Sequence, residues 1–130
     1  MNRLLAIAAA AATALPLVAA DIDASKLPPA SDKKGVTFAK DIQPLFERSC
    51  YKCHGAEKQK GKLRLDSLEA TLKGGENGAS IEKGNSAKSA LVASVARLVE
   101  DEAMPPEGKG QAFSKEEVGL LRAWIDQGAK

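Results

Sequence analysis

Large and reactive side chains are scarce in this sequence of 130 residues. It has five aromatic residues, two cysteines, two methionines and a single histidine. One histidine and two cysteines supply at most three of the four ligands that a closed structural zinc site needs. Basic residues number 19 and acidic residues 17, so the net charge of +2 gives no electrostatic reason to expect nucleic acid or an anionic membrane as a partner.

Long apolar runs are absent after residue 20. Residues 4–20 carry no charge, follow Arg3 and end in the small residues Val18-Ala19-Ala20. The run is short for a spanning helix, and the pattern predicts a signal peptide over residues 1–20. An uncleaved N-terminal anchor is the alternative. We therefore expect an exported, periplasmic mature chain of 110 residues with no transmembrane segment and a net charge of +1.

Residues 21–35 have no helical or strand periodicity and contain Pro28-Pro29. They are predicted to form a flexible N-terminal tether, whose plain alternative is a frayed chain end. The remaining residues, 36–130, are short enough for one domain. No strand alternation occurs there, so the predicted fold class is all-α.

The first helix is predicted within residues 36–50, where Phe38, Ile42, Leu45 and Phe46 recur on one face. Pro44 cannot donate a backbone hydrogen bond in a helix interior. The regular helix must therefore start at Thr37 or Asp41, or bend near Pro44.

Three further helices are predicted downstream. Asp66 is the expected N-cap of a helix over residues 67–72, and another helix is expected over residues 88–100. The last helix follows a capping box, in which Ser114 is the cap and Glu117 reaches back toward it. Its apolar stripe consists of Val118, Leu121, Trp124 and Ile125.

The sequence Cys50-Tyr51-Lys52-Cys53-His54 has the C-x-x-C-H pattern of covalent haem attachment. The two thiols add to the vinyl groups of the porphyrin, and the following imidazole ligates the iron. A disulfide is the alternative for two exported cysteines, but it leaves His54 without a role. A thioredoxin-like site would need a βαβ context, which the sequence does not indicate. We therefore expect one haem c per chain, with His54 as a metal ligand.

Met104 is the predicted second axial ligand. His54 is the only histidine, and removal of the leader leaves Met104 as the only methionine. It precedes Pro105 and Pro106, which restrict the backbone, and a thioether is a good ligand for haem iron. The alternatives are a methionine that only fills the core, or an iron ligated by a lysine, by the N-terminal amine or left open.

Several phrases resemble the planctomycete-type cytochrome c domain, which is a class I c-type cytochrome. They are FAKDIQPLF at 38–46, CYKCHG at 50–55, KGKLRLD at 60–66, MPP at 104–106 and WIDQGA at 124–129. The resemblance implies a small monohaem class I cytochrome c fold whose N- and C-terminal helices cross. It also implies that haem is bound through Cys50, Cys53, His54 and Met104.

Three other residues have two interpretations each. Gly119 either permits a close approach to the last helix or is merely an exposed glycine. Arg64 either donates to a haem propionate or faces solvent. Trp124 either donates to a propionate through its indole or packs in the core. The stripe of the last helix is expected to pack against Phe38, Ile42 and Phe46.

These observations favour a periplasmic carrier of single electrons, and not an enzyme, because a His/Met-ligated iron has no open position for substrate. Its partners would be redox proteins that bind transiently, and a monomer is favoured. Lysines 52, 58, 60 and 62 either steer an acidic partner or are solvated loop residues. The alternatives are a haem-bearing subunit of a larger dehydrogenase or oxidase complex, or a haem sensor or peroxidase-like protein if Met104 is not a stable ligand.

Overall fold

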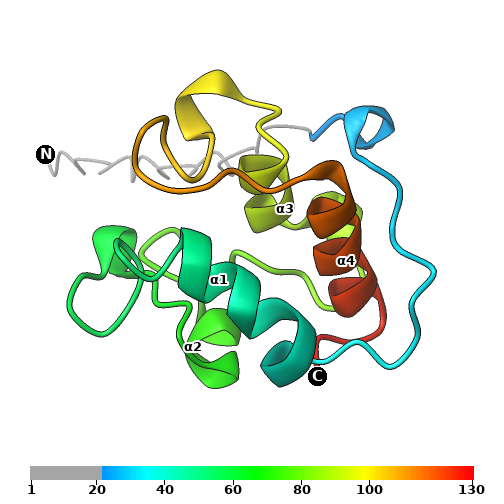
Figure 1. The fold of residues 1–130 in the computed structure, drawn as a ribbon, viewed down its shortest axis with the longest axis horizontal. Helices are drawn as coiled ribbons and strands as arrows, with labels where there is room; N and C mark the ends of the chain where they lie inside the picture. Colours follow the sequence, from blue (N-terminus) through cyan, green and yellow to red (C-terminus); the bar gives the residue numbers. More distant parts are fainter. Residues whose placement is uncertain (1–21) are drawn as a thin grey trace, which may run out of the picture.

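The structure, a computed structural model, describes residues 22–130, so the predicted signal peptide lies outside the described part of the chain. The described residues form helices and loops with no strand, which confirms the all-α fold class (Figure 1). The α-helices are α1 (Gln43–Ser49), α2 (Leu68–Lys73), α3 (Ala90–Val95) and α4 (Lys115–Asp126). Shorter helical turns are η1 (Ala24–Lys26), η2 (Phe38–Ile42), η3 (Lys60–Lys62), η4 (Ser86–Lys88) and η5 (Glu100–Glu102). No helix of residues 22–130 has the length and apolar character needed to cross a membrane.

Pro44 is accommodated by a π-helical turn, η2, that leads directly into α1. Thr37 caps this turn by accepting a hydrogen bond from the Lys40 amide, and Asp41 accepts one from the Thr37 amide at 3.0 Å. Pro44 then falls in the first turn of α1, where a missing N–H costs nothing. The helix therefore begins at Thr37 and changes its winding at the proline, as the sequence required.

Helix α4 is the longest α-helix of the described chain, and its predicted start is confirmed. Ser114 Oγ accepts from the Glu117 amide at 3.1 Å, and the Glu117 carboxylate accepts from the Ser114 amide at 2.9 Å. The apolar stripe of α4 is buried and contacts η2, with the Phe38 and Trp124 rings 5.8 Å apart. The contact joins the two ends of the domain, while a crossing of the two terminal helices stays a prediction.

An ion pair between Arg48 and Glu117 also joins α1 to α4. The guanidinium donates to both carboxylate oxygens at 2.6 and 2.9 Å, and it lies 5.9 Å from the centre of the Phe113 ring. Glu117 thus completes the cap of α4 and binds α1 with the same carboxylate. This pair could not be predicted from the sequence, because the two residues are 69 positions apart.

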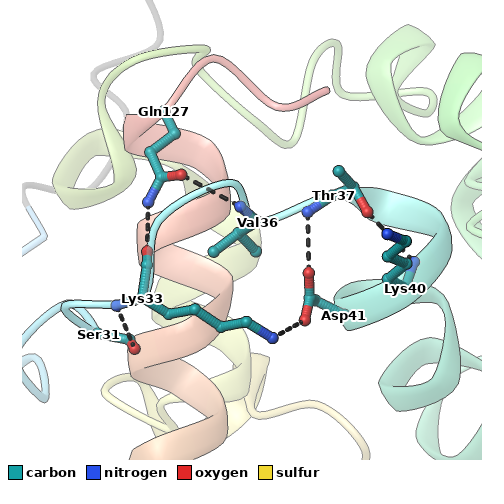
Figure 2. A network of polar contacts seen from close by, with 7 residues as sticks. All are labelled: Ser31, Lys33, Val36, Thr37, Lys40, Asp41 and Gln127. Atoms are coloured by element: carbon teal, nitrogen blue, oxygen red, sulfur yellow. Dashed lines mark hydrogen bonds and ion pairs between the residues drawn. The ribbon is translucent and has the colours of Figure 1, made fainter.

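The N-terminal segment, residues 22–35, packs along α4 in the structure instead of extending away as a tether. Its backbone is bound at three points: the Ser31 amide donates to the Gly119 carbonyl, Arg122 donates to the Pro28 carbonyl, and Gln127 donates to the Lys33 carbonyl. Figure 2 shows the last of these contacts together with the ion pair between Lys33 and Asp41. A segment rich in proline and charged residues can still bind to a helix when side chains of that helix donate hydrogen bonds to its backbone carbonyls. Amino-acid composition does not show whether such donors are within reach.

Gly119 permits this approach. A Cβ at Gly119 would lie 2.6 Å from the Pro29 carbonyl oxygen, so the close-approach interpretation of this glycine is correct. The neighbour is the N-terminal segment rather than another helix.

Two predicted helix boundaries differ from the structure. Ser67, not Asp66, caps α2 by accepting from the Ala70 amide, because Asp66 is held by Arg64 through two hydrogen bonds of 2.6 and 2.8 Å. Helix α3 ends at Val95, well before residue 100, because Arg97 adopts a left-handed backbone conformation with a φ of 58°. A left-handed residue interrupts the ladder of backbone hydrogen bonds and ends a helix.

Candidate haem site

A cavity of about 420 Å³ lies between the C-x-x-C-H motif and α3. Five segments contribute to its wall: residues 49–54, 60–65, 75–80, 90–95 and 101–109. Its lining is mainly apolar, and its volume falls within the range of small-molecule and cofactor pockets. Cys50, Cys53, His54 and Met104 all line it, although they lie up to 54 positions apart in the sequence.

The attachment motif forms a tight turn that continues from α1. The Cys50 amide donates to the Phe46 carbonyl at 2.7 Å, and the His54 amide donates to the Cys50 carbonyl at 2.9 Å. Cys50 is buried and Cys53 is half-buried, and both are free thiols. Burial raises the pKa of the Cys50 thiol to about 12. The turn brings both sulfurs and the imidazole to the same cavity.

The His54 imidazole is oriented by a backbone carbonyl. Nδ1 donates to the Leu63 carbonyl at 3.2 Å, and the Leu65 amide donates back to the His54 carbonyl at 2.8 Å. A carbonyl can only accept, so in the neutral imidazole Nδ1 carries the proton and Nε2 keeps its lone pair. A donor bond from the second ring nitrogen is what orients histidines that ligate metals. The chemistry of His54 therefore fits an axial ligand.

A close contact between two loops forms another part of the wall. A Cβ at Gly75 would lie 2.5 Å from the Gly61 carbonyl oxygen, and the Glu76 amide donates to that same oxygen at 2.8 Å. Gly74 has a φ of 79° and ends α2, so the chain can turn toward the cavity at this point. Glycine at both positions lets residues 75–80 lie against the segment that carries Leu63.

Met104 enters the cavity from the loop after η5. Its amide donates to the Ser94 carbonyl of α3 at 2.9 Å, and Arg97 Nη1 donates to the Pro105 carbonyl at 2.7 Å. Pro105 is buried, and the peptide bond between Met104 and Pro105 is cis. The loop that carries the methionine is thus held by α3 through Ser94 and by Arg97, which follows the helix.

Arg64 and Trp124 do not line the cavity. Arg64 is bound to Asp66, and the Trp124 indole donates to the Lys130 carbonyl at 2.9 Å while its side chain is fully buried. The core interpretation of Trp124 therefore fits the structure. The Arg64 guanidinium is directed to a neighbouring carboxylate and not to the cavity.

The charges at the cavity wall are of both signs. Lys52 and Lys60 line it, whereas Lys58 and Lys62 do not. The other charged lining residues are Glu76, Asp101, Glu102 and Lys109. The cavity wall is therefore not uniformly basic, and steering of an acidic partner by the four lysines stays a prediction.

The geometry fits a haem bound at this cavity. Two thiols at attachment spacing, one imidazole with a free Nε2 and one thioether meet in a mainly apolar space. Sequence reasoning missed three contributors: the Leu63 carbonyl, the loop at residues 75–80 and Arg97. Of these, only the loop could have been found from the sequence, through its glycines. The Leu63 contact is made by a backbone carbonyl and the Arg97 side chain binds one, so neither has a recognisable sequence pattern.

An all-α chain that brings a C-x-x-C-H motif to such a cavity has the character of a c-type cytochrome. Residues 50–108 match the family model described as Planctomycete cytochrome C, so this stretch is similar to cytochrome c domains of the planctomycete type. The match includes the attachment motif and Met104, and it confirms the resemblance predicted from the sequence. No curated protein and no solved structure matched the chain in the corresponding searches.

Proposed function

We propose that this protein is an exported carrier of single electrons with one covalent haem c. Cys50 and Cys53 would attach the haem, and His54 and Met104 would be its axial ligands. The observation that carries the proposal is that His54, with Nδ1 fixed on a carbonyl, and the only methionine of the described chain line the same cavity. When bound, the haem supplies one-electron redox chemistry.

Different residues of the chain would orient the ligands and exclude water from the haem. The Leu63 carbonyl fixes the tautomer of His54 and holds its ring in place. Ser94 holds the backbone of Met104. Apolar residues such as Leu65, Leu91 and Val95 line the cavity and keep water from it. If His54 and Met104 both held the iron, no position at the metal would be left for substrate, and this would favour electron transfer over an enzymatic reaction.

The test is the optical spectrum of the purified holoprotein, oxidised and reduced, combined with a redox titration. We expect the spectrum of a covalently bound c-type haem, a sulfur-to-iron charge-transfer band in the oxidised protein and a single one-electron transition. A haem that organic solvent extracts from the chain would overturn covalent attachment through Cys50 and Cys53.

The same measurements separate the rival functions. If the charge-transfer band is missing and carbon monoxide binds the reduced protein readily, a sensor or peroxidase-like protein is favoured. If the band is present but the protein co-purifies with a dehydrogenase or oxidase, it acts as a subunit of a complex. A monomeric protein that exchanges electrons with a soluble redox partner supports the freely diffusing carrier.

A further inference from the structure

Arg97 is placed to restrain the loop that carries Met104. It lies two residues after the end of α3, and its Nη1 donates to the Pro105 carbonyl at 2.7 Å. The amide of Met104 donates to the Ser94 carbonyl, which also accepts from the Arg97 amide at 3.1 Å. Ser94 of α3 and Arg97 therefore bind the chain on both sides of the methionine side chain.

The direction of the Arg97 side chain is not explained by charge. Three carboxylates, Glu100, Asp101 and Glu102, follow it in the sequence, yet within residues 22–130 Arg97 forms no ion pair. Its guanidinium instead reaches a main-chain carbonyl of the residue after Met104. The left-handed backbone of Arg97 turns the chain away from α3 at the start of the loop.

We propose that Arg97 is a positioning residue that keeps Met104 at the metal and thereby closes the second axial position to other ligands. This inference rests on the proposed function, because it requires Met104 to be the ligand. It adds a specific claim, namely that a side chain outside the ligand set controls how often the position opens.

The size of the expected effect follows from the hydrogen bond. A hydrogen bond to a charged group contributes roughly 1.5 kcal/mol or more, and each 1.4 kcal/mol changes an equilibrium constant about tenfold. An external ligand binds only the open form, so its apparent affinity rises in proportion to the open population. Loss of the Arg97 contact should therefore raise the apparent affinity for an external ligand roughly tenfold.

The experiment is a titration of oxidised holoprotein with imidazole, followed by the loss of the sulfur-to-iron band. Arg97→Ala removes the guanidinium but keeps a Cβ. The left-handed backbone conformation at position 97 is therefore equally disfavoured in the variant and in the unaltered protein. Arg122→Ala is the control, because Arg122 donates to the Pro28 carbonyl at 2.5 Å and to the Ser86 hydroxyl at 3.0 Å, and neither partner lines the cavity. Arg97→Lys tests rescue by another cationic donor. The reduction potential is not the readout, since loss of a nearby positive charge would lower it without any change in position.

We expect imidazole to bind Arg97→Ala roughly tenfold more tightly than it binds Arg122→Ala or the unaltered protein, with Arg97→Lys between them. Equal affinities in Arg97→Ala and Arg122→Ala would overturn the role of Arg97. If the unaltered protein lacks the sulfur-to-iron band, the proposed ligation by Met104 is wrong. This outcome is distinct from the one that overturns the role of Arg97. Melting temperatures of both alanine variants show whether a general loss of stability accounts for the change.

Discussion

The imidazole of His54 depends on a main-chain atom for its orientation. The C-x-x-C-H spacing is local, so the sequence alone predicted the thiols and the imidazole that line the cavity. The Leu63 carbonyl that receives Nδ1 could not be predicted, because every residue carries a carbonyl and its direction is set by the fold. Met104 was predicted by elimination, since residues 21–130 contain no other methionine and no histidine besides His54.

Substitution of Met104 tests the second ligand directly. A thioether ligand raises the reduction potential of a haem that is ligated by histidine and methionine. Met104→Ala removes this thioether. We expect the variant to have a lower midpoint potential, no sulfur-to-iron band and ready binding of carbon monoxide when reduced. Potentiometric titration and optical spectra measure all three. An unchanged spectrum would exclude Met104 as ligand.

Gly75 tests the loop contact in the cavity wall. Gly75→Ala would place a Cβ 2.5 Å from the Gly61 carbonyl oxygen, so one of the two loops must move. Overpacking of this kind costs about 1–3 kcal/mol. We expect a lower melting temperature of the holoprotein and a weaker sulfur-to-iron band.

The control for Gly75 is Gly78→Ala. A Cβ at Gly78 meets no atom within 4 Å, but the residue has a φ of 94°. This variant reports backbone strain without a collision. If Gly75→Ala melts at the temperature of the unaltered protein, the loops are not in the close contact described above.

At the scale of elements, the start of α4 was predicted correctly, whereas the end of α3 and the cap of α2 were not. The capping box of α4 involves four consecutive residues, and it was correctly located from the sequence. The end of α3 was not, because the apolar pattern continues to Val99 while the backbone reverses at Arg97. The choice between Ser67 and Asp66 as the cap of α2 was also beyond sequence reasoning, since Asp66 has a competing partner in Arg64.

The ion pair between α1 and α4 should make stability depend on pH. The hydrogen bond from Arg48 holds the pKa of the Glu117 carboxyl below its ordinary value of 4.5. A lowered pKa in the folded state stabilises the fold above the ordinary pKa, and this contribution is lost as the pH falls through the folded-state pKa. Glu117→Gln keeps a side chain able to complete the capping box but removes the charge.

We expect Glu117→Gln to lower the free energy of unfolding by about 1 kcal/mol at pH 7, and by progressively less below pH 4.5. Denaturant unfolding at several pH values measures the difference. Asp66→Asn is the control, because it removes an ion pair that is local. Arg64 and Asp66 are two residues apart, so this pair does not join two helices. A difference for Glu117→Gln that does not change with pH would show that the ion pair is not its cause.

At the scale of the whole molecule, the N-terminal segment is part of the folded domain. Alanine normally favours a helix over glycine by about 1 kcal/mol, but a Cβ at Gly119 would collide with the Pro29 carbonyl. We therefore expect Gly119→Ala to destabilise the chain and to free the segment.

Limited proteolysis with trypsin detects this release through faster cleavage at Lys26 and Lys33. Glu116→Ala, at an exposed position of the same helix, is the matched control and should leave the cleavage rate unchanged. A higher stability of Gly119→Ala with unchanged cleavage would mean that the segment does not lie against α4.

The contacts that close the molecule have a consequence for the order in which it matures. Pro28 and Arg122, Lys33 and Gln127, and Val36 and Gln127 are joined by hydrogen bonds across 94, 94 and 91 positions. Loops of this length close slowly compared with a local turn, and these contacts require residues near the end of the chain. The turn from Cys50 to His54 needs only its own neighbours. The attachment turn can therefore form before the contacts that close the molecule.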